Sequence, residues 1–254
     1  MERLVFVHGF GQTRRCWGPG PGLIEQALAQ ADDDSPGRKF VTAAVDLPGH
    51  GEAATIRMSP VEVGAALAEQ TGSGVLVGYS LGARMALHAA LDPSCTLTGL
   101  VLISGTAGLA DPEERATRQR GDDSLADRIE AIGVPAFVEE WLAQPMFATL
   151  PPGAVHRVER RTNTAAGLAA SLRSCGTGAQ ESLWNRLGEI TIPTLVMAGS
   201  LDPKFAALGR QLAGTLASGR FIEVPGAGHS VHLERPEEFA TAVAEFVSHL
   251  RERS

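Results

Sequence analysis

A serine in the segment Gly78-Tyr79-Ser80-Leu81-Gly82 carries the clearest chemical signal of the chain. This G-x-S-x-G pattern follows a β-like run and precedes a helix-like one, a setting in which small residues allow a sharp strand-to-helix turn. A serine hydroxyl is unreactive at neutral pH unless a general base lies beside it. The pattern therefore predicts a functional Ser80, and the alternative is an idle serine in a tight turn.

The partners of Ser80 are expected later in the chain, because this kind of turn is followed in order by an acid and a histidine. Asp202 comes just past the strand-like run PTLVMAG, and His229 follows the last such run. Both lie where strands of a parallel sheet end, which is where such sheets place their sites. We predict a triad of Ser80, His229 and Asp202. Asp46 is the alternative acid, but it ends a strand that precedes the serine.

The other histidines are less well placed for catalysis. They lie at a strand end, in a loop, on a helix, in the helical insertion described below, just after the triad histidine and near the C-terminus: His8, His50, His88, His156, His232 and His249. His229 and His232 are three residues apart, so a metal pair is conceivable, but no third ligand accompanies them. We therefore predict no metal site.

Negative charge that develops on a substrate oxygen needs amide donors beside the serine. The residue after the serine, Leu81, supplies one amide N–H in this kind of turn. The turn His8-Gly9-Phe10-Gly11 after the first strand offers the amide of Phe10 as the other, because its glycines allow a close approach. We predict an oxyanion hole formed by the amides of Phe10 and Leu81.

These positions require a sheet whose strands end at one edge, and the hydrophobic pattern predicts such a sheet. Apolar, β-branched runs alternate with amphipathic stretches, which is typical of parallel strands buried on both faces and covered by helices. The runs lie at 4–9, 40–46, 74–80, 97–105, 193–200 and 220–226, and clear helical stretches lie at 59–70, 81–92 and 236–253. The polar segment 32–39 is expected to be a solvated turn. The predicted fold class is α/β, of the α/β-hydrolase type, with a mostly parallel sheet flanked by helices.

One region interrupts this alternation. From about residue 107 to 188 no run reads as a strand, and stretches such as SLADRIEAIG and VPAFVEEWLAQ are polar and helical in pattern. We predict a helical lid (cap) at 107–188, inserted into a hydrolase-like core made of 1–106 and 189–254.

Composition limits the possible partners. The chain has 254 residues, 44% of them hydrophobic, and a net charge of −7, which argues against nucleic acid or an anionic membrane as a partner. Any anionic ligand must therefore be held by a local cluster of cations. No apolar run approaches the about 20 residues of a membrane span, and the N-terminus lacks a signal-peptide pattern. Cys16, Cys95 and Cys175 show no metal-type spacing and are expected to be reduced thiols of a cytoplasmic protein.

Several segments resemble one enzyme family. HGFGQTRRCW, DLPGHG, GYSLGARMAL and the string GLAASLRSCGTGAQESLWNRL followed by PTLVMAGSLDPKF are similar to the 2-succinyl-6-hydroxy-2,4-cyclohexadiene-1-carboxylate (SHCHC) synthases of menaquinone biosynthesis. The resemblance spans nearly the whole chain. It implies a lyase without metal or organic cofactor, which removes a proton from the polycarboxylate SEPHCHC and expels its enolpyruvyl group as pyruvate. A monomer or small homo-oligomer is expected.

The resemblance also assigns residues. It implies a triad in which His229, oriented by Asp202, takes the proton of Ser80, so that the serine oxygen is the base. It implies Arg84, Arg118 and Arg160 as holders of substrate carboxylates, although Arg161 stands beside the last of these. The residues implied as pocket lining are Phe10, Tyr79, Trp141 and Phe147.

The chain departs from the family pattern at three points. Ala83 replaces the glycine of many relatives. Ser200 stands where a glutamate is commoner, so a local salt bridge is expected to be missing. The N-terminal residues correspond to the third strand of the usual fold, so a sheet of about six strands is expected.

Arg84 separates the competing interpretations of the serine. It lies four residues after Ser80, near the same helical face. It is either a buried or surface ion pair or a bidentate holder of a carboxylate. A carboxylesterase, a thioesterase, a C–C bond hydrolase or a non-catalytic binding protein on the same scaffold could share the triad, but an esterase needs an apolar acyl pocket where this cation lies.

Overall fold

The computed structural model describes residues 2–31 and 40–252, so the turn expected at 32–39 lies outside the described residues. Its centre is a sheet of six strands, all parallel, in the order β2-β1-β3-β4-β5-β6. The strands are β1 (Glu2–Val7), β2 (Phe40–Val45), β3 (Val75–Tyr79), β4 (Gly99–Ile103), β5 (Thr194–Gly199) and β6 (Gly219–Val224). Each predicted strand is therefore confirmed to within about two residues at either end.

The inner strands are buried on both faces, as their continuous apolar runs predict. Every residue of β3, β4 and β5 is buried. The two edge strands differ. In β6 only the last residue is fully buried and the first two are exposed, and in β2 none of residues 41–45 is fully buried. An edge strand has a neighbour on one side only, so the expectation of burial on both faces was wrong for β2 and β6.

Helices cover both faces of the sheet and its C-terminal end. The α-helices are α1 (Gly20–Ala31), α2 (Pro60–Thr71), α3 (Leu81–Ala90), α4 (Pro112–Leu142), α5 (Arg157–Arg160), α6 (Ala165–Cys175), α7 (Pro203–Thr215), α8 (Val231–Glu234) and α9 (Pro236–Glu252). Short 3-10 helices lie at Gly51–Ala53, Pro145–Phe147, Pro152–Ala154 and Trp184–Glu189. The helices expected at 59–70, 81–92 and 236–253 correspond to α2, α3 and α9, apart from residue 253, which is not described.

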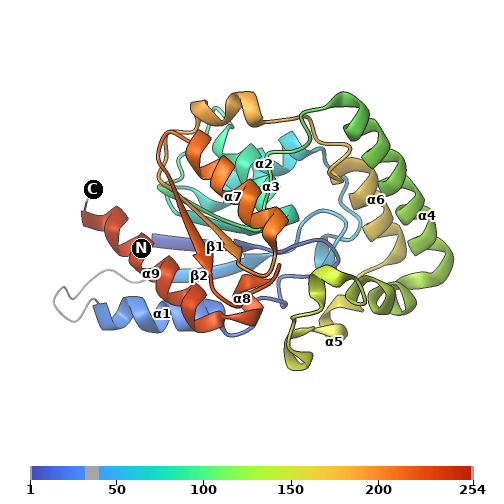
Figure 1. Ribbon diagram of the computed structural model, residues 1–254, viewed down its shortest axis with the longest axis horizontal. Helices are drawn as coiled ribbons and strands as arrows, with labels where there is room; N and C mark the ends of the chain where they lie inside the picture. The colour runs from blue at the N-terminus through green and yellow to red at the C-terminus, as the bar shows by residue number, and fades with distance from the viewer. Residues whose placement is uncertain (1, 32–39, 253–254) are drawn as a thin grey trace.

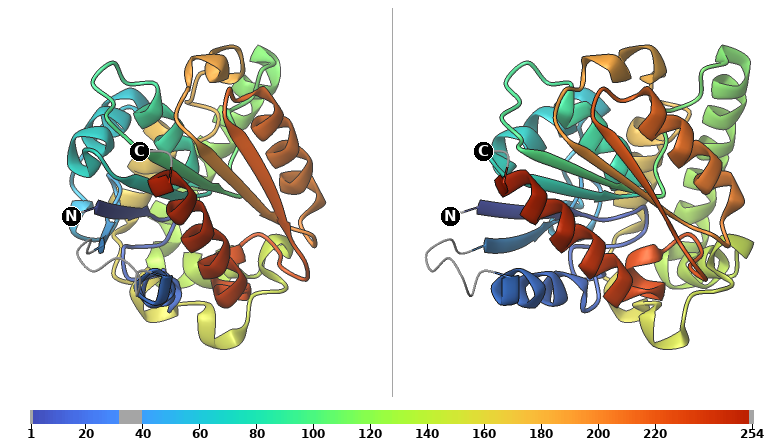
Figure 2. Two further views of the ribbon diagram at one scale, coloured as in Figure 1. Left: turned by 90° about the vertical axis from the view of Figure 1, so that its left-hand side faces the viewer. Right: turned by 60° about the vertical axis from the view of Figure 1, so that its left-hand side comes forward.

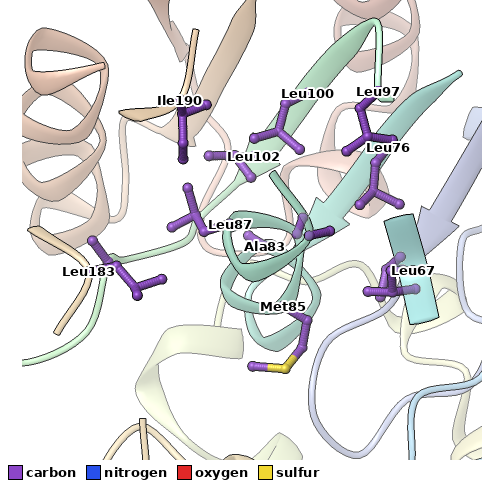
Figure 3. Packing of buried hydrophobic residues seen from close by; sticks show 14 of the residues in the cluster. Leu67, Leu76, Ala83, Met85, Leu87, Leu97, Leu100, Leu102, Leu183 and Ile190 are labelled. Atoms are coloured by element: carbon purple, nitrogen blue, oxygen red, sulfur yellow. The ribbon is translucent and has the colours of Figure 1, made fainter. Parts of the chain in front are cut away.

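Two hydrophobic clusters fix the sheet between its helices. On one face, residues of α2, α3 and the 3-10 helix Trp184–Glu189 pack on the strands, and Figure 3 shows Leu87, Leu100 and Leu102 meeting in this layer. On the other face, α1 and α9 lie side by side (Figure 2) and pack on side chains such as Phe6 and Val101. This sandwich holds the C-terminal ends of the strands in fixed positions.

The segment 107–188, called the lid segment below, lies between β4 and β5 in the chain and contains no strand. Its long helix α4 is broken at Gly133 (φ 75°, ψ 165°), just before Pro135, and packs against α6. Figure 1 shows α4 and α6 next to each other at the end of the molecule opposite the N-terminus. Within the described residues, no helix has the length and hydropathy needed to cross a membrane.

Candidate active site

Ser80 lies at a sharp turn between β3 and α3. Its backbone has φ 52° and ψ −105°, a conformation that is strained for a residue with a side chain. The flanking glycines make the turn possible. A Cβ at Gly78 would lie 2.5 Å from the carbonyl oxygen of Gly82, and one at Gly82 would lie 2.0 Å from that of Val7. The sequence pattern therefore places Ser80 as predicted, half-buried at the end of a central strand.

The three residues of the predicted triad lie together. His229 Nε2 is 3.3 Å from Ser80 Oγ, and His229 Nδ1 is 2.7 Å from Asp202 Oδ2. Asp202 Oδ1 also accepts the Phe205 amide at 3.3 Å, which caps α7. Partial burial opposes ionisation of this carboxyl, but its hydrogen bonds with His229 and Phe205 hold the pKa of Asp202 below its usual value. An ionised Asp202 accepts Nδ1–H and leaves Nε2 facing the serine.

The loop that carries His229 is fixed by contacts that the sequence did not reveal. Ser104, at the end of β4 with φ 48°, donates its hydroxyl to the His229 carbonyl at 2.7 Å. The Phe205 ring packs edge-on against the imidazole, with centroids 4.5 Å apart. Ser200, where a salt bridge was expected to be missing, accepts the Gly226 amide at 2.9 Å. The hydrogen bonds made by Ser104 and Ser200 thus connect the loops after β4, β5 and β6.

The loop after β1 brings the Phe10 amide to the site. The Gly9 amide donates to Gln12 Oε1 at 3.0 Å, and the Gly11 amide donates to His50 Nε2 at 3.2 Å. Burial lowers the pKa of His50 to about 3, so its ring is neutral and can accept this bond. For the amides of Phe10 and Leu81, no hydrogen bond to another described residue is found. Both residues line the same cavity as Ser80, as an oxyanion hole requires.

Asp46, His8 and His232 have structural contacts. Asp46 accepts the amides of Arg14 (2.7 Å) and Glu52 (3.0 Å), which organises a loop. His8 is fully buried and its Nε2 accepts the Leu47 amide at 3.1 Å. The ring of His232 packs against Trp17 and Tyr79, with centroids 4.6 and 4.5 Å away.

A cavity of about 490 Å³ opens in front of the serine. Core residues and lid-segment residues share its wall: Phe10, Ser80, Leu81, Arg84, Ser104, Lys204, Phe205 and His229 from the core, and Arg118, Leu125, Trp141, Met146, Leu172 and Thr177 from the lid segment. Its charged wall residues are three cations, Arg84, Arg118 and Lys204, and one carboxylate, Asp122, so positive charge predominates there in a chain of net charge −7. Such a cavity favours an anionic ligand over a neutral acyl chain.

Arg84 is buried on α3 and reaches the lid segment. Its Nη2 donates to the Cys175 carbonyl at 2.8 Å, and its Nη1 donates to Gln180 Oε1 at 2.8 Å and to the Gly176 carbonyl at 3.4 Å. Burial lowers the pKa of Arg84 to about 10, so it is charged at neutral pH. Of its five N–H groups, these bonds leave two for a ligand. Arg84 therefore lines the cavity and also connects the core to the lid segment.

Arg118 and Lys204 line the same cavity from different elements. Arg118, on α4, donates Nε–H to the buried Asp122 at 2.8 Å and is 47% exposed. Lys204 was not predicted from the sequence. It occupies the first turn of α7, a position where the helix dipole disfavours a cation. The sequence does contain a signal for Lys204. It is a lysine in an unfavourable helix position, two residues after the predicted triad acid Asp202.

Arg160 lies on the other side of the serine. Its side chain is 1% exposed, whereas Arg161 points outward and pairs with Glu139 at 2.9 Å. Arg160, Tyr79 and Phe147 line a second cavity of about 20 Å³ that also contacts Ser80 and His229. The Tyr79 hydroxyl bonds with Ser230 at 2.8 Å. Every predicted site residue thus lines one of the two cavities, apart from Asp202, which lies behind His229.

The chain is similar in sequence to a family profile and to proteins that carry the name of one synthase. The profile described as Alpha/beta hydrolase family matches residues 4–242. A protein of Bacillus subtilis (strain 168), named provisionally as 2-succinyl-6-hydroxy-2,4-cyclohexadiene-1-carboxylate synthase, is 34% identical over 97% of this chain and 90% of its own length. The synthase of that name from Escherichia coli O1:K1 / APEC is 32% identical over 96% of this chain and 93% of its own.

A solved structure extends the similarity to three dimensions. The structure of MenH from S. aureus superposes with a TM-score of 0.87 at 28% sequence identity. The match covers 98% of this chain and 94% of that one. The likeness therefore includes the lid segment as well as the sheet.

Proposed function

The chain belongs to the α/β-hydrolase family and, within it, to the SHCHC synthases; it is an enzyme, and from this premise we propose that it is a lyase of menaquinone biosynthesis. Its proposed substrate is SEPHCHC, from which it eliminates pyruvate to give SHCHC. One observation carries the proposal for this chain: the serine–histidine pair faces a cavity lined by Arg84, Arg118 and Lys204. A substrate with several carboxylates fits such a wall.

In the proposed reaction, the Ser80 oxygen is the base. His229 takes the serine proton at Nε2, while Asp202 accepts Nδ1–H and so fixes the tautomer and the ring orientation. The serine oxygen then removes the proton from the ring carbon that bears the succinyl group. No acyl-enzyme forms.

Loss of this proton leads to elimination of the enolpyruvyl group. The electrons of the broken C–H bond form a double bond at C2, the existing ring double bond shifts, and the C–O bond at C5 breaks. The enolpyruvyl group leaves as an enolate and takes up a proton to become pyruvate. The proton that His229 received from Ser80 balances this uptake when it is given up to the enolate or to solvent, because the serine has been reprotonated by the substrate carbon. During the step, negative charge develops on the succinyl ketone oxygen, and the amides of Phe10 and Leu81 are positioned to stabilise it.

The cationic side chains have a positioning role in this proposal. Guanidinium groups hold carboxylates in a fixed geometry, so that the reacting C–H lies against the serine oxygen. The lid segment supplies Arg118 and the carbonyl and amide acceptors that orient Arg84. We propose that residues 107–188 act as a lid over a core formed by 1–106 and 189–254.

The experiment that tests this function measures pyruvate release from SEPHCHC, which is generated in the assay by the preceding enzyme. The Ser80→Ala variant should release pyruvate at least about 10³-fold more slowly, because both the base and its histidine partner are disabled. Ser73→Ala, at an exposed serine, is the matched control and should keep the wild-type rate. Equal rates for Ser80→Ala and wild type would refute the proposed base. Fast hydrolysis of nitrophenyl esters without pyruvate release would instead identify an esterase.

A further inference from the structure

A buried carboxylate, Asp122, lies in the wall of the 490 Å³ cavity. It is the only acidic side chain among the described residues that line this cavity, and it is 2% exposed. A carboxylate at this place repels the anionic ligand that the surrounding cations favour, and its burial costs free energy unless it is well hydrogen-bonded. Asp122 is therefore favourable here only if its contacts offset both costs.

Asp122 holds Arg118, which lies one turn earlier on α4. Its Oδ1 accepts Nε–H of Arg118 at 2.8 Å. This bond fixes the guanidinium group at one nitrogen and leaves its two Nη groups, which make no hydrogen bond to the described residues. The Nη groups carry four N–H donors, enough for a bidentate bond to a carboxylate. Asp122 thus determines which edge of Arg118 remains open to a ligand.

The same carboxylate holds the turn that follows α6, residues 176–179. Its Oδ2 accepts the Gly178 amide at 3.2 Å. The turn lies directly against the carboxylate, because a Cβ at Gly176 would be 2.6 Å from Asp122 Oδ2. The carbonyls of Gly176 and of Cys175, at the end of α6, accept N–H groups of Arg84. Asp122 is thereby connected to the second arginine through the segment that provides its acceptors.

The charge of Asp122 also acts on both arginines. Burial is the main cause that lowers the pKa of Arg84; the positive charge of Arg118 lowers it as well, whereas the negative charge of Asp122 raises it. The carboxylate therefore offsets part of the repulsion between two guanidinium groups that line one cavity. This effect is present before any ligand binds.

We propose that Asp122 is a positioning residue of the active site. It fixes Arg118 directly, and Arg84 through the turn after α6, in the geometry that receives the carboxylates of the substrate. The role rests on the proposed function and adds a group that acts through the arginines. Without the carboxylate, the Arg118 side chain could rotate freely and the two cations would move apart.

Asp122→Asn tests the proposal with a nearly isosteric change. The amide oxygen can still accept one N–H group, but the NH₂ group cannot accept the Gly178 amide, and the negative charge is gone. Both arginines should then be less well oriented, so kcat for pyruvate release should fall about 10- to 100-fold. KM for SEPHCHC should stay within about 3-fold of the wild-type value, because a cavity without this negative charge attracts a polyanion more strongly.

A double-mutant cycle with Arg118→Ala tests whether Asp122 acts through that arginine. If it does, the loss of kcat/KM in the double variant should be at least about 5-fold smaller than the product of the losses in the two single variants. Residues that act independently would give losses that multiply. Thermal unfolding of each variant is recorded, and kinetics are measured well below the lowest Tm.

Asp123→Asn is the matched control. Asp123 is the next residue on α4, and its Oδ1 accepts Nε2–H of Gln119 at 2.9 Å, which is also an (i, i+4) contact. It is not one of the described residues that line the cavity. This variant should keep the wild-type kcat and KM.

Two kinds of result would overturn the role of Asp122. One is a wild-type kcat in Asp122→Asn, or losses that multiply in the cycle. The other is a rise in KM at least as large as the fall in kcat, together with a lower Tm, which would indicate that Asp122 only stabilises the lid segment. Absence of pyruvate release by the wild type would instead be a failure of the proposed function, and this role would fail with it.

Discussion

Asp202 has two hydrogen-bonding functions at the scale of a single residue. One carboxylate oxygen accepts His229 Nδ1–H at 2.7 Å, and the other accepts the Phe205 amide at 3.3 Å. Only the first takes part in the proposed proton transfer. A substitution that keeps the helix cap but alters the bond to the histidine can therefore separate catalysis from folding.

Asp202→Asn is such a substitution. The amide retains an oxygen for the Phe205 amide, but its NH₂ group favours the tautomer in which His229 carries its proton on Nε2. That tautomer cannot accept the serine proton, so kcat for pyruvate release should fall by about 10²- to 10⁴-fold. Steady-state kinetics and a thermal unfolding scan check both parts. Asp92→Asn, at another aspartate that accepts a backbone amide (Ser94, 2.9 Å), should leave kcat unchanged. A variant with near-normal kcat would argue against histidine as the general base.

The sequence predicts the triad because each of its members follows a strand, and strand ends meet at one edge of a parallel sheet. It does not predict Gln12, His50 or Ser104, whose hydrogen bonds join loops that are distant in the sequence. The choice between Arg160 and Arg161 also depends on which face of a four-residue helix turns inward, and four residues carry no usable periodicity.

At the scale of elements, the lid segment touches the core backbone to backbone. Helix α6 crosses the loop after β2 where Gly167 meets Gly49, which has φ 83°. A Cβ at Gly167 would lie 2.5 Å from the Gly49 carbonyl oxygen, and one at Gly49 would lie 2.4 Å from that of Gly167. Nearby, Asn163 accepts the Gly51 amide at 2.9 Å. The position of the lid segment therefore depends on two residues that lack side chains.

Gly167→Ala should separate these elements. Alanine normally stabilises a helix by about 0.5–1 kcal/mol relative to glycine, but here its methyl group must push α6 away from the loop, with an expected loss of about 1–3 kcal/mol in the free energy of unfolding. Hydrogen exchange of the α6 amides should become faster. Urea unfolding and exchange mass spectrometry measure both effects. Gly214→Ala, on α7 with no atom within 4 Å of the added carbon, is the control and should be neutral or stabilising. Unchanged exchange in α6 would mean that this contact does not hold the lid segment in place.

At this scale, some elements could be predicted from the sequence and others could not. The strands and helices α2, α3 and α9 have clear hydrophobic patterns and could be predicted, although α2 and α3 each contain one glycine. Helix α1 begins with Gly-Pro-Gly and α7 contains two internal glycines, signals that weaken a helix prediction. The break of α4 at Gly133 is set by a left-handed backbone conformation, which composition does not specify.

At the scale of the whole molecule, several buried histidines connect stability to pH. Burial lowers the pKa of His8 and His88 to about 4 and that of His50 to about 3, and it holds His232 well below the usual value. Between pH 6.5 and these values the unfolded chain binds protons that the folded chain does not. Stability is therefore full above pH 6.5, falls as the pH drops, and stops falling below the folded-state values.

Each such histidine should contribute a slope of about 1.4 kcal/mol per pH unit in that window. We expect the urea midpoint to decline steeply between pH 6 and 4.5. His88→Leu should flatten the curve, because Nε2 of His88 has no partner among the described residues and leucine cannot be protonated. Urea titrations of both proteins at pH 7.5, 6, 5 and 4.5 provide the comparison. If the urea midpoints of the wild type and of His88→Leu declined in parallel as the pH drops, His88 would not be a group that takes up a proton on unfolding.

The order of the elements along the chain has a consequence for the growing polypeptide. Ser80 and both predicted oxyanion amides belong to the first third of the chain, whereas Asp202 and His229 lie on its last quarter, after the lid segment. During synthesis, the serine turn can form on β1, β3 and α3 well before its activating partners leave the ribosome. A nascent or prematurely terminated chain thus carries an unactivated serine, and reactivity arises only when β5 and β6 complete the sheet edge. In the proposed mechanism, therefore, catalysis requires that the C-terminal strands β5 and β6 have joined the sheet.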